Sequence, residues 1–377
     1  MPSEFPLSRR DFLRASAISA GTIGFALGSQ STADAVPIRD DRNLIILNLV
    51  GGPSPFETFD PKPNAPERIR GPFGVTRTKI PGVLLSEHLP KLAGMLDRFA
   101  IVRSVHHEEA PIHEIGQQIL QTGRVTTTGA EFPHIGAIIS ALKAKRDARI
   151  PSSVILGGAM GSLGVSISRG QTAGYLGHSH EPAILFDDAT HASDARYGDS
   201  QFGRSCQQAI RLIESGTRCV TVNMFTSVFN TTTWDCHADG ASLPTTLDDY
   251  RQSLCPNLDH ALTTLVRDLD DRGLLESTLV VAMGEMGRTP EINYVGGRDH
   301  SASCWSIVMA GAGVRGGQVI GASDAHGVAP KDRPVHASEV FATMVHALGI
   351  PPEMRIPGPT GEPIALTTAQ PIRELFR

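Results

Sequence analysis

Residues 43–53 read NLIILNLVGGP. A nearly continuous apolar run is followed at once by two glycines and a proline, which is the pattern of a strand buried on both faces that leads into a tight loop. Further apolar runs that predict strands occur at 99–103, 153–156, 218–224, 278–283 and 306–310. Since strands buried on both faces are typical of parallel sheets, the sequence predicts a sheet that is mostly parallel.

Amphipathic segments lie between these strands. The longest, residues 245–272, places leucines three and four residues apart and is followed by Gly273, a typical helix C-cap. Shorter helices are predicted at 113–121, 134–145, 200–215 and 337–348. Alternating strands and helices predict an α/β fold in which helices cover both faces of the sheet and ligands bind at the carboxyl ends of the strands.

The composition is that of an ordinary folded protein. The chain has 377 residues, of which 40% are hydrophobic and 19% charged, and this excludes disordered, collagen-like and coiled-coil classes. A net charge of −5 disfavours a nucleic-acid partner. Residues 157–200 are rich in Gly, His, Asp and Ser, and we expect them to form a surface insertion.

The N-terminus has the parts of an export signal. Arg9 and Arg10 precede an apolar run at 15–27, and small residues at 33–35 offer a cleavage site. This resembles a twin-arginine signal peptide, so we expect residues 1–35 to be removed and residues 36–377 to form the mature domain. The implied partner is the twin-arginine export machinery, and the implied location is the periplasm or the medium. No later run reaches ~18 apolar residues, so we expect no integral membrane span in the mature chain.

The five cysteines leave two interpretations open. They are Cys206, Cys219, Cys236, Cys255 and Cys304. None forms a C-x-x-C motif, so a zinc ribbon or a thioredoxin site is unsupported. An oxidising compartment allows up to two disulfides, and buried free thiols fit equally well.

Acidic and histidine side chains recur in the loops next to the predicted strands. They are His113, Glu114, Asp235, His237, Glu285, Asp299 and His300. Divalent metals need carboxylate oxygens and imidazole nitrogens gathered from separate loops, so this pattern predicts one shared metal site. Arg288 and Arg298 accompany these loops and would pair either with an anionic substrate or with the carboxylates of the site.

Other catalytic motifs are incomplete. Residues 311–316 fit G-x-G-x-x-G, but residues 317–321 do not read as the start of a helix, so we expect no nucleotide cofactor. The chain also lacks the G-x-S-x-G motif of α/β-hydrolases. A redox or dinucleotide enzyme is therefore disfavoured.

Several motifs together resemble one family. They are GGPS at 51–54, FDPKP at 59–63, WDCH at 234–237, GEMGRTP at 284–290 and GRDH at 297–300, together with the twin-arginine signal. The chain resembles the bacterial domain-of-unknown-function family fifteen-oh-one, a sulfatase-like branch of the alkaline phosphatase superfamily. The resemblance covers nearly all of the mature chain. It implies a three-layer sandwich around a mostly parallel central sheet.

The resemblance also shows where the site departs from sulfatases. Their first strand ends in two metal-binding aspartates, whereas here it ends in Gly51 and Gly52, with Glu57 or Asp60 downstream as possible substitutes. TGR at 122–124 matches the end of the sulfatase nucleophile motif, and counting back places His113 where the Cys or Ser that becomes formylglycine would stand. Ordinary sulfatase chemistry is therefore unsupported, and His113 would be a ligand, a base or a covalent nucleophile.

Two hypotheses follow for function. The resemblance implies an exported, metal-dependent hydrolase of sulfate or phosphate esters, with an anionic ester or glycan as substrate and water as the attacking group. A divalent metal (Zn, Mn or Ca) would be held by Asp235, His237, Asp299 and His300, and the catalytic residues would be His113, Glu285 and Arg288. The alternative is a non-catalytic periplasmic binding protein on the same fold, which Gly51 and Gly52 favour.

Overall fold

The computed structural model describes residues 41–126, 128–143, 147, 149–161, 167–186 and 194–376, and the predicted signal peptide lies outside these described residues. Within the described residues, the central sheet has nine strands. They are β1 (Asn43–Asn48), β4 (Ala100–His106), β5 (Ser153–Leu156), β6 (Ala183–Leu185), β7 (Cys219–Asn223), β8 (Thr278–Met283), β11 (Trp305–Ala310), β12 (Gln318–Ile320) and β15 (Val335–His336). Their order is β12-β4-β11-β8-β1-β7-β5-β6, and β15 pairs with the end of β4.

Strand β1 lies in the middle of this sheet. It runs parallel to β7 on one side and to β8 on the other, so that Leu44 lies beside Cys219 and Leu279. Every residue of β1 is buried, as the apolar run at 43–50 predicts.

Strand β11 is antiparallel to both of its neighbours, β4 and β8. The other pairings in this sheet are parallel. The beginning of β11 therefore lies at the edge where β1, β4, β7 and β8 end. This reversal brings residues that precede β11 to the carboxyl ends of the parallel strands.

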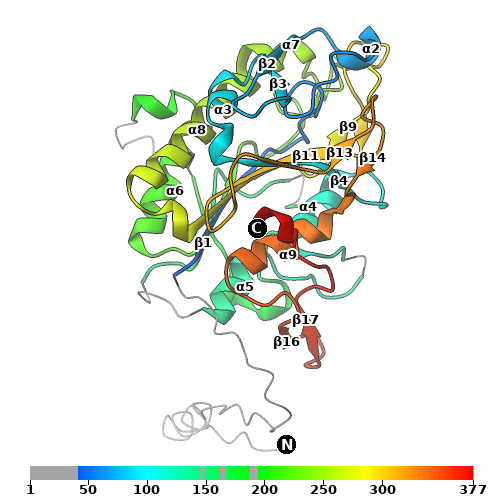
Figure 1. The fold of residues 1–377 in the computed structure, drawn as a ribbon. Coiled ribbons are helices and arrows are strands. Elements are labelled where there is room, and N and C mark those ends of the chain that lie inside the picture. Colours follow the sequence, from blue (N-terminus) through cyan, green and yellow to red (C-terminus); the bar gives the residue numbers. More distant parts are fainter. Residues whose placement is uncertain are drawn as a thin grey trace, which may run out of the picture. The chain divides into compact units, whose positions relative to one another are not determined.

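Helices cover both faces of the sheet. Most lie in these two layers. Among the described residues, the α-helices of four or more residues are α2 (Glu67–Arg70), α3 (Pro90–Gly94), α4 (His113–Thr122), α5 (Ile135–Leu142), α6 (Gln201–Ser215), α8 (Cys255–Asp271) and α9 (Ala337–Ala347). Figure 1 shows α3, α6 and α8 on one side of the sheet and α4, α5 and α9 on the other.

The side chains of β1 are divided between the two apolar layers. Ile45 and Leu47 pack with the layer of α3, α6 and α8, whereas Leu44 and Ile46 pack with the layer of α4, α5 and α9. Alternate side chains of a strand point to opposite faces, so one continuous apolar strand supplies both cores. The predicted three-layer α/β sandwich with a mostly parallel sheet is confirmed.

The long helix predicted at 245–272 is interrupted. A short helix, α7 (Leu247–Asp249), is followed by a π-helical turn at Tyr250–Leu254, and the regular helix α8 begins at Cys255. Pro256 lies in the first turn of α8 and has no amide hydrogen for the preceding turn. The interruption therefore falls where the helical hydrogen bonds lose a donor.

Residues 157–200 do more than form a surface insertion. Among their described residues, β6 extends the central sheet by pairing in parallel with β5. Met160, Gln171 and Tyr197 of this segment are buried. The segment is thus partly built into one edge of the sheet.

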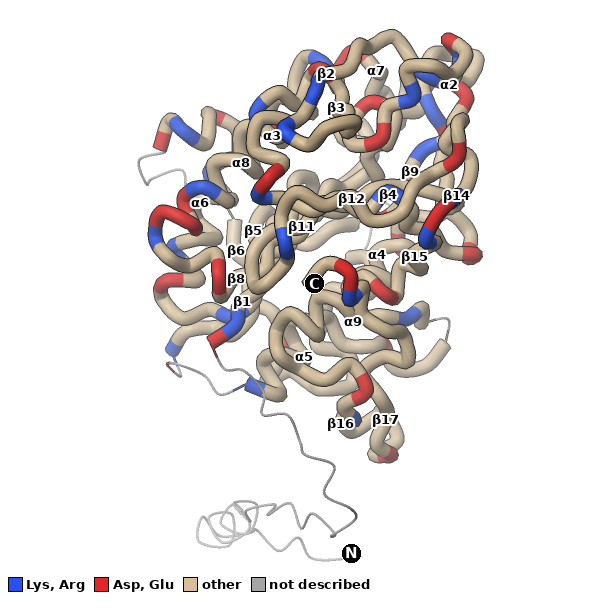
Figure 2. Tube along the Cα trace, viewed as in Figure 1, with Lys and Arg blue, Asp and Glu red and all other residues tan. Residues whose placement is uncertain are grey.

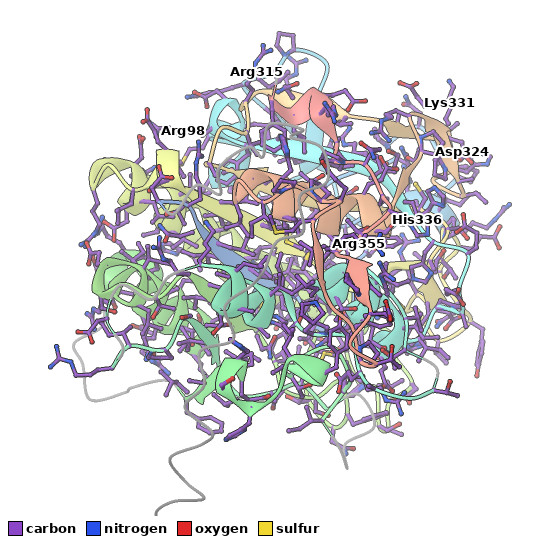
Figure 3. All side chains as sticks on the ribbon, turned by 90° about the horizontal axis from the view of Figure 1, so that it is seen from below. Arg98, Arg315, Asp324, Lys331, His336 and Arg355 are labelled. Atoms are coloured by element: carbon purple, nitrogen blue, oxygen red, sulfur yellow. The ribbon has the colours of Figure 1, made fainter. Side chains whose placement is uncertain are left out.

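The remaining short strands are β2 (Val75–Arg77), β3 (Leu84–Ser86), β9 (Gly287–Arg288), β10 (His300–Ser301), β13 (Ala322–Ser323), β14 (Pro330–Asp332), β16 (Arg355–Pro357) and β17 (Pro363–Ala365). Residues 311–316, with the G-x-G-x-x-G pattern, follow β11 and lead into strand β12 rather than a helix. Gly313, Val314 and Gly316 of this stretch line a cavity together with Arg98, and Figure 3 labels Arg98 and Arg315 in the upper part of the view.

The charged residues are mixed along the chain, as in an ordinary folded protein. Basic and acidic residues are interspersed along the trace in Figure 2.

All five cysteines are buried free thiols, so of the two interpretations of the sequence the structure favours free thiols over disulfides. In the part of the chain that the structure describes, no helix is long and apolar enough to cross a membrane.

Candidate metal centre

Four segments meet at the carboxyl edge of the sheet. Glu285 follows β8, Asp235 lies in the loop after β7, and His113 is the first residue of α4, which follows β4. His300 lies on β10, directly before β11, and its strand pairs with β9 so that His300 is opposite Arg288. The antiparallel direction of β11 therefore explains why His300 reaches the same edge as the other groups.

Trp234 fixes the loop that carries Asp235. Its buried indole packs edge to face on Tyr250, with 5.0 Å between the ring centroids. The Tyr250 hydroxyl donates to the carbonyl of Trp234 at 2.8 Å and accepts from the amide of Ser54 at 3.1 Å. The aromatic residue of the WDCH motif thus ties the loop to the segment that follows β1.

Asp235 lies at the centre of the site and is buried. Its Oδ1 lies 2.6 Å from Arg288 Nη1, 3.0 Å from His237 Nε2 and 3.1 Å from His300 Nε2. Its Oδ2 lies 3.1 Å from His113 Nε2. Burial by itself would raise the pKa of this carboxyl, but the Arg288 charge and the hydrogen bonds to the histidines hold the pKa well below its usual range.

The three histidines share one arrangement. The outer nitrogen Nδ1 lies 2.6 Å from Glu285 Oε1 in His113, 3.1 Å from Asp299 Oδ1 in His237, and 2.9 Å from the Pro111 carbonyl oxygen in His300. Because these oxygens are acceptors, they favour a proton on each Nδ1. In a neutral ring, that proton leaves the lone pair on Nε2, which faces Asp235.

This arrangement is typical of metal-binding histidines, whose second ring nitrogen donates to a carboxylate or a carbonyl. Ligand atoms of His113, Asp235 and His300 all lie within 4.8 Å of one another. His237 Nε2 is buried and makes no hydrogen bond among the described residues, although it lies close to Asp235. Imidazole nitrogens with one carboxylate suit zinc and similar borderline ions, whereas calcium prefers a shell made of oxygens.

Two of the histidines have shifted pKa values. Burial would lower the pKa of His113, but its hydrogen bonds to Asp235 and Glu285 outweigh this and raise the pKa to about 9. Burial lowers the pKa of His300, against the opposing effect of Asp235. A metal would have to displace the His113 proton, so acid should weaken metal binding at this site.

Gly51 and Gly52 hold the site together through their backbone. The Gly51 amide donates to Glu285 Oε1 at 2.7 Å. Gly51 has φ of 109°, and a Cβ there would overlap the backbone nitrogen of Asp235, so only glycine fits. Where the sulfatase pattern has metal-binding aspartates, this chain brings its backbone close to Asp235 and Glu285.

Arg288 is completely buried and supports Asp235. Besides that ion pair, its Nε donates to the Gly52 carbonyl at 2.9 Å, and its Nη2 donates to the Gly51 carbonyl. The structure therefore favours a role in holding Asp235 over direct contact with a substrate.

Arg298 also pairs with a carboxylate, and neither proposed substitute ligand reaches the metal centre. Arg298 forms a two-pronged ion pair with Glu57, with contacts of 2.6 and 2.9 Å. Asp60 pairs with Lys62 at 3.0 Å and Arg103 at 3.5 Å. Glu57 and Asp60 are thus engaged elsewhere.

The structure sorts the sequence-predicted residues into two groups. His113, Asp235, His237 and His300 surround one point, and Glu285, Arg288 and Asp299 lie behind them. Asp299, predicted as a ligand, contacts His237 Nδ1 instead, and its side chain is 56% exposed.

Sequence reasoning missed two supporting residues. Pro111 orients His300 through its carbonyl, and Asn293 Nδ2 donates to the His237 carbonyl and to Asp299 Oδ1, both at 3.1 Å. A backbone carbonyl leaves no signature in a sequence motif, so the role of Pro111 could not be read from the chain. Asn293 lies between the GEMGRTP and GRDH motifs, and this position was the only available signal.

Comparisons with known proteins identify a family and a set of similar folds. The family model described as "Protein of unknown function (DUF1501)" matches residues 41–192 and 183–376. No curated protein matches the chain.

Solved structures with a similar fold include the PsFucS1 sulfatase from Pseudoalteromonas sp., at 12% identity and a TM-score of 0.44, covering 83% of this chain and 68% of that one. The lipoteichoic acid synthase LtaP from Listeria monocytogenes has 12% identity and a TM-score of 0.45, covering 91% and 78%. A protein in the alkaline phosphatase superfamily from Vibrio parahaemolyticus has 11% identity and a TM-score of 0.43, covering 84% and 68%.

Proposed function

The chain belongs to the DUF1501 family, and from that premise and from its site we propose that it is an exported, metal-dependent hydrolase of sulfate or phosphate esters. One observation carries the metal part of this proposal. His113, His237 and His300 each direct Nδ1 to an acceptor oxygen and Nε2 to Asp235. The ester class follows from the resemblance of the sequence motifs to sulfatase-like proteins.

The roles of the residues follow from their contacts. His113, Asp235 and His300 would hold the metal, with His237 as a further ligand. Glu285 orients His113, Asp299 orients His237, and Arg288 holds Asp235 in place and keeps it ionised. When bound, a divalent metal supplies a Lewis acid for the ester oxygen.

The attacking group is water in this proposal. His113 occupies the position that the nucleophile has in the sulfatase motif, and both of its ring nitrogens are engaged, with Glu285 and with Asp235. With Nδ1 on Glu285 and Nε2 on the metal that it would bind, this imidazole has no free nitrogen with which to form a covalent intermediate.

Turnover of 4-nitrophenyl phosphate and 4-nitrophenyl sulfate by the mature protein tests this function. The protein is stripped with EDTA and then reloaded with zinc or manganese. We expect turnover to require the metal and to fall at least ~100-fold in His300→Asn, since a lost ligand costs more than a lost supporting contact. The matched control is His260→Asn on α8, outside the site, which should keep full activity. Absence of turnover in metal-loaded protein, or equal turnover in His300→Asn, contradicts the proposal.

A second candidate is the non-catalytic binding protein. It is favoured because the Arg288 guanidinium already neutralises the Asp235 carboxylate within the protein. The network of Asp235, Arg288 and the histidines would then hold the loops together without taking part in a reaction. A protein that binds anionic glycans, contains no metal and turns over neither ester would support this candidate.

A further inference from the structure

Gln117 is a buried amide outside the ligand set of the metal centre. It is 1% exposed, and neither its Nε2 nor its Oε1 has a hydrogen-bond partner among the described residues. Buried polar atoms without partners cost free energy, so a purely structural position would favour an apolar side chain. An amide at such a position is suited to a ligand that both donates and accepts hydrogen bonds.

Helix α4 directs Gln117 toward the metal centre. His113 and Gln117 are four residues apart on this helix, so their side chains lie on the same face. Long helical side chains point back toward the N-terminus of their helix, which for Gln117 is the turn that carries His113. The neighbouring Gly116 lies so close to Glu285 that a Cβ would overlap the Glu285 carbonyl oxygen. Gln117 therefore belongs to the part of α4 that packs against the site.

The buried side of the site contains acceptor atoms that the protein does not satisfy. Glu285 directs Oε1 to His113 Nδ1 at 2.6 Å, whereas its Oε2 is buried and has no hydrogen-bond partner in the part of the chain that the structure describes. Gln117 Oε1 is a second acceptor of this kind. A fully ionised anion has no proton to offer these acceptors, whereas water both donates and accepts. The unpartnered atoms therefore favour water over an anionic group on this side.

The solvent-facing side of the site is formed by other residues. The side chains of His237 and His300 are 19% and 24% exposed, and that of Asp299 is 56% exposed. An ester would enter from this side, with its leaving group toward solvent. Water held beside the buried Gln117 would then reach the phosphorus or sulfur from the side away from the leaving group, as an in-line displacement requires.

We propose that Gln117 holds and orients the water that attacks the ester. The proposal rests on the proposed function and adds a catalytic residue to it. Gln117 Oε1 accepts a hydrogen of the water, which leaves a lone pair of the water oxygen directed at the ester. A glutamine amide also orients the attacking water in some phosphoryl-transfer enzymes.

The role of Gln117 in the reaction is limited to orientation. The water oxygen forms a bond to the phosphorus or sulfur, and the bond from that atom to the ester oxygen breaks. Overall, one proton passes from the water to the alcohol that leaves. Gln117 does not carry this proton, because its amide is a hydrogen-bonding group rather than an acid or a base.

Calorimetry with two anions on the zinc-loaded protein tests this role. Orthovanadate forms five-coordinate adducts with an oxygen in the position of the attacking water, whereas methylphosphonate has no such oxygen. Gln117→Met removes the amide at similar volume. We expect it to weaken orthovanadate binding at least ~10-fold, with metal content and methylphosphonate affinity unchanged. Gln117→Asn keeps an amide on a shorter side chain, and we expect the same selective loss.

The matched control is Gln121→Met, one turn farther from His113 on α4. Gln121 is also 1% exposed, and its Oε1 also has no hydrogen-bond partner among the described residues. This variant should bind both anions as the wild type does. Equal losses for the two anions in Gln117→Met would place the amide on the anion itself and overturn the proposal. Unchanged orthovanadate affinity in Gln117→Met, or no orthovanadate binding to the wild type, would also overturn it.

The failure of this proposal can be distinguished from the failure of the hydrolase. If either nitrophenyl ester is turned over, Gln117→Met should lower kcat at least ~10-fold with little change in KM. Turnover that Gln117→Met leaves unchanged supports the hydrolase and contradicts the role of Gln117. A selective loss of orthovanadate binding without turnover of either ester supports the contact made by Gln117 and contradicts the hydrolase.

Discussion

Asp235 is the residue at which the charges of the site are balanced. Its side chain is completely buried beside the equally buried Arg288 guanidinium, with 2.6 Å between the charged atoms. Asp235→Asn would leave that guanidinium without a counter-charge, which costs about 3–5 kcal/mol for a buried pair. We expect this loss in the free energy of unfolding, measured in urea.

The control for this variant is Asp299→Asn, whose side chain is 56% exposed. It should change the free energy of unfolding by less than ~1 kcal/mol. If the two variants were equally stable, the balancing role of Asp235 would be wrong.

His134 gives the protein a pH-dependent stability outside the metal centre. Complete burial lowers its pKa to about 4, and its Nδ1 accepts from the Gly136 amide at 2.9 Å at the start of α5. Between pH 6.5 and about 4, the unfolded chain binds a proton at His134 that the folded chain does not. Stability is therefore fully present above pH 6.5 and is lost as the pH falls through this window, by up to ~1.4 kcal/mol per pH unit.

The variant His134→Asn tests this origin, because Asn can still accept the Gly136 hydrogen bond. Urea unfolding at several pH values between 6.5 and 4 should give a shallower slope than the wild type shows. An unchanged slope would assign the acid sensitivity to other groups.

At the residue scale, the sequence could predict which side chains gather but not how each is used. Asp235, His237, Glu285 and His300 were found because each lies in a loop beside a predicted strand. Whether a histidine is a ligand depends on the partner of its outer nitrogen, and for His300 this partner is a backbone carbonyl. Such a contact requires the three-dimensional structure.

Helix α4 is the element that positions the site most closely. Gly116 packs against the Glu285 carbonyl, and a Cβ at this position would overlap that oxygen. Gly116→Ala should therefore push α4 and His113 away from Asp235. We expect a destabilisation of about 1–3 kcal/mol in urea and at least tenfold weaker zinc binding in a competition titration.

Gly94→Ala on α3 is the matched helical control, because a Cβ there meets no atom within 4 Å. This variant should keep its zinc affinity and gain up to ~1 kcal/mol from the higher helix propensity of alanine. Equal zinc affinity in Gly116→Ala and Gly94→Ala would contradict the positioning role of α4.

At the element scale, the strands that supply the core were predicted well. The runs at 43–50, 153–156 and 278–283 correspond to β1, β5 and β8, because burial on both faces demands a continuous apolar sequence. Strands β6, β12 and β15 were missed, since they are only two or three residues long and partly exposed. The direction of β11 could not be predicted, because an apolar run reads the same in both orientations.

At the scale of the whole molecule, export is a proposal that the N-terminal sequence supports. Replacing Arg9 and Arg10 together by lysine should retain the protein in the cytoplasm, because the paired arginines are the feature of the signal that the export machinery reads. Cell fractionation measures this, and Arg14→Lys is the control, which should still be exported. Unchanged export of the double-lysine variant would contradict the twin-arginine assignment.

The three-layer fold explains why one edge of the molecule gathers so many functional groups. The ends of β4, β7 and β8 and the beginning of β11 lie together, so residues far apart in the sequence meet around Asp235. The sequence predicted this gathering from the rule that ligands bind at the carboxyl ends of parallel strands. It could not predict that Gly51 and Gly52 would serve as backbone contacts to Glu285 and Arg288.

The most direct test of the metal centre is elemental analysis of the mature protein, purified without a histidine tag, beside the double variant Asp235→Ala/His300→Ala. We expect about one divalent ion per chain in the wild type, which is the number that a single site of this ligand set holds, and its loss in the variant. No metal in the wild type after incubation with zinc, manganese and calcium, or equal metal in both proteins, would contradict it.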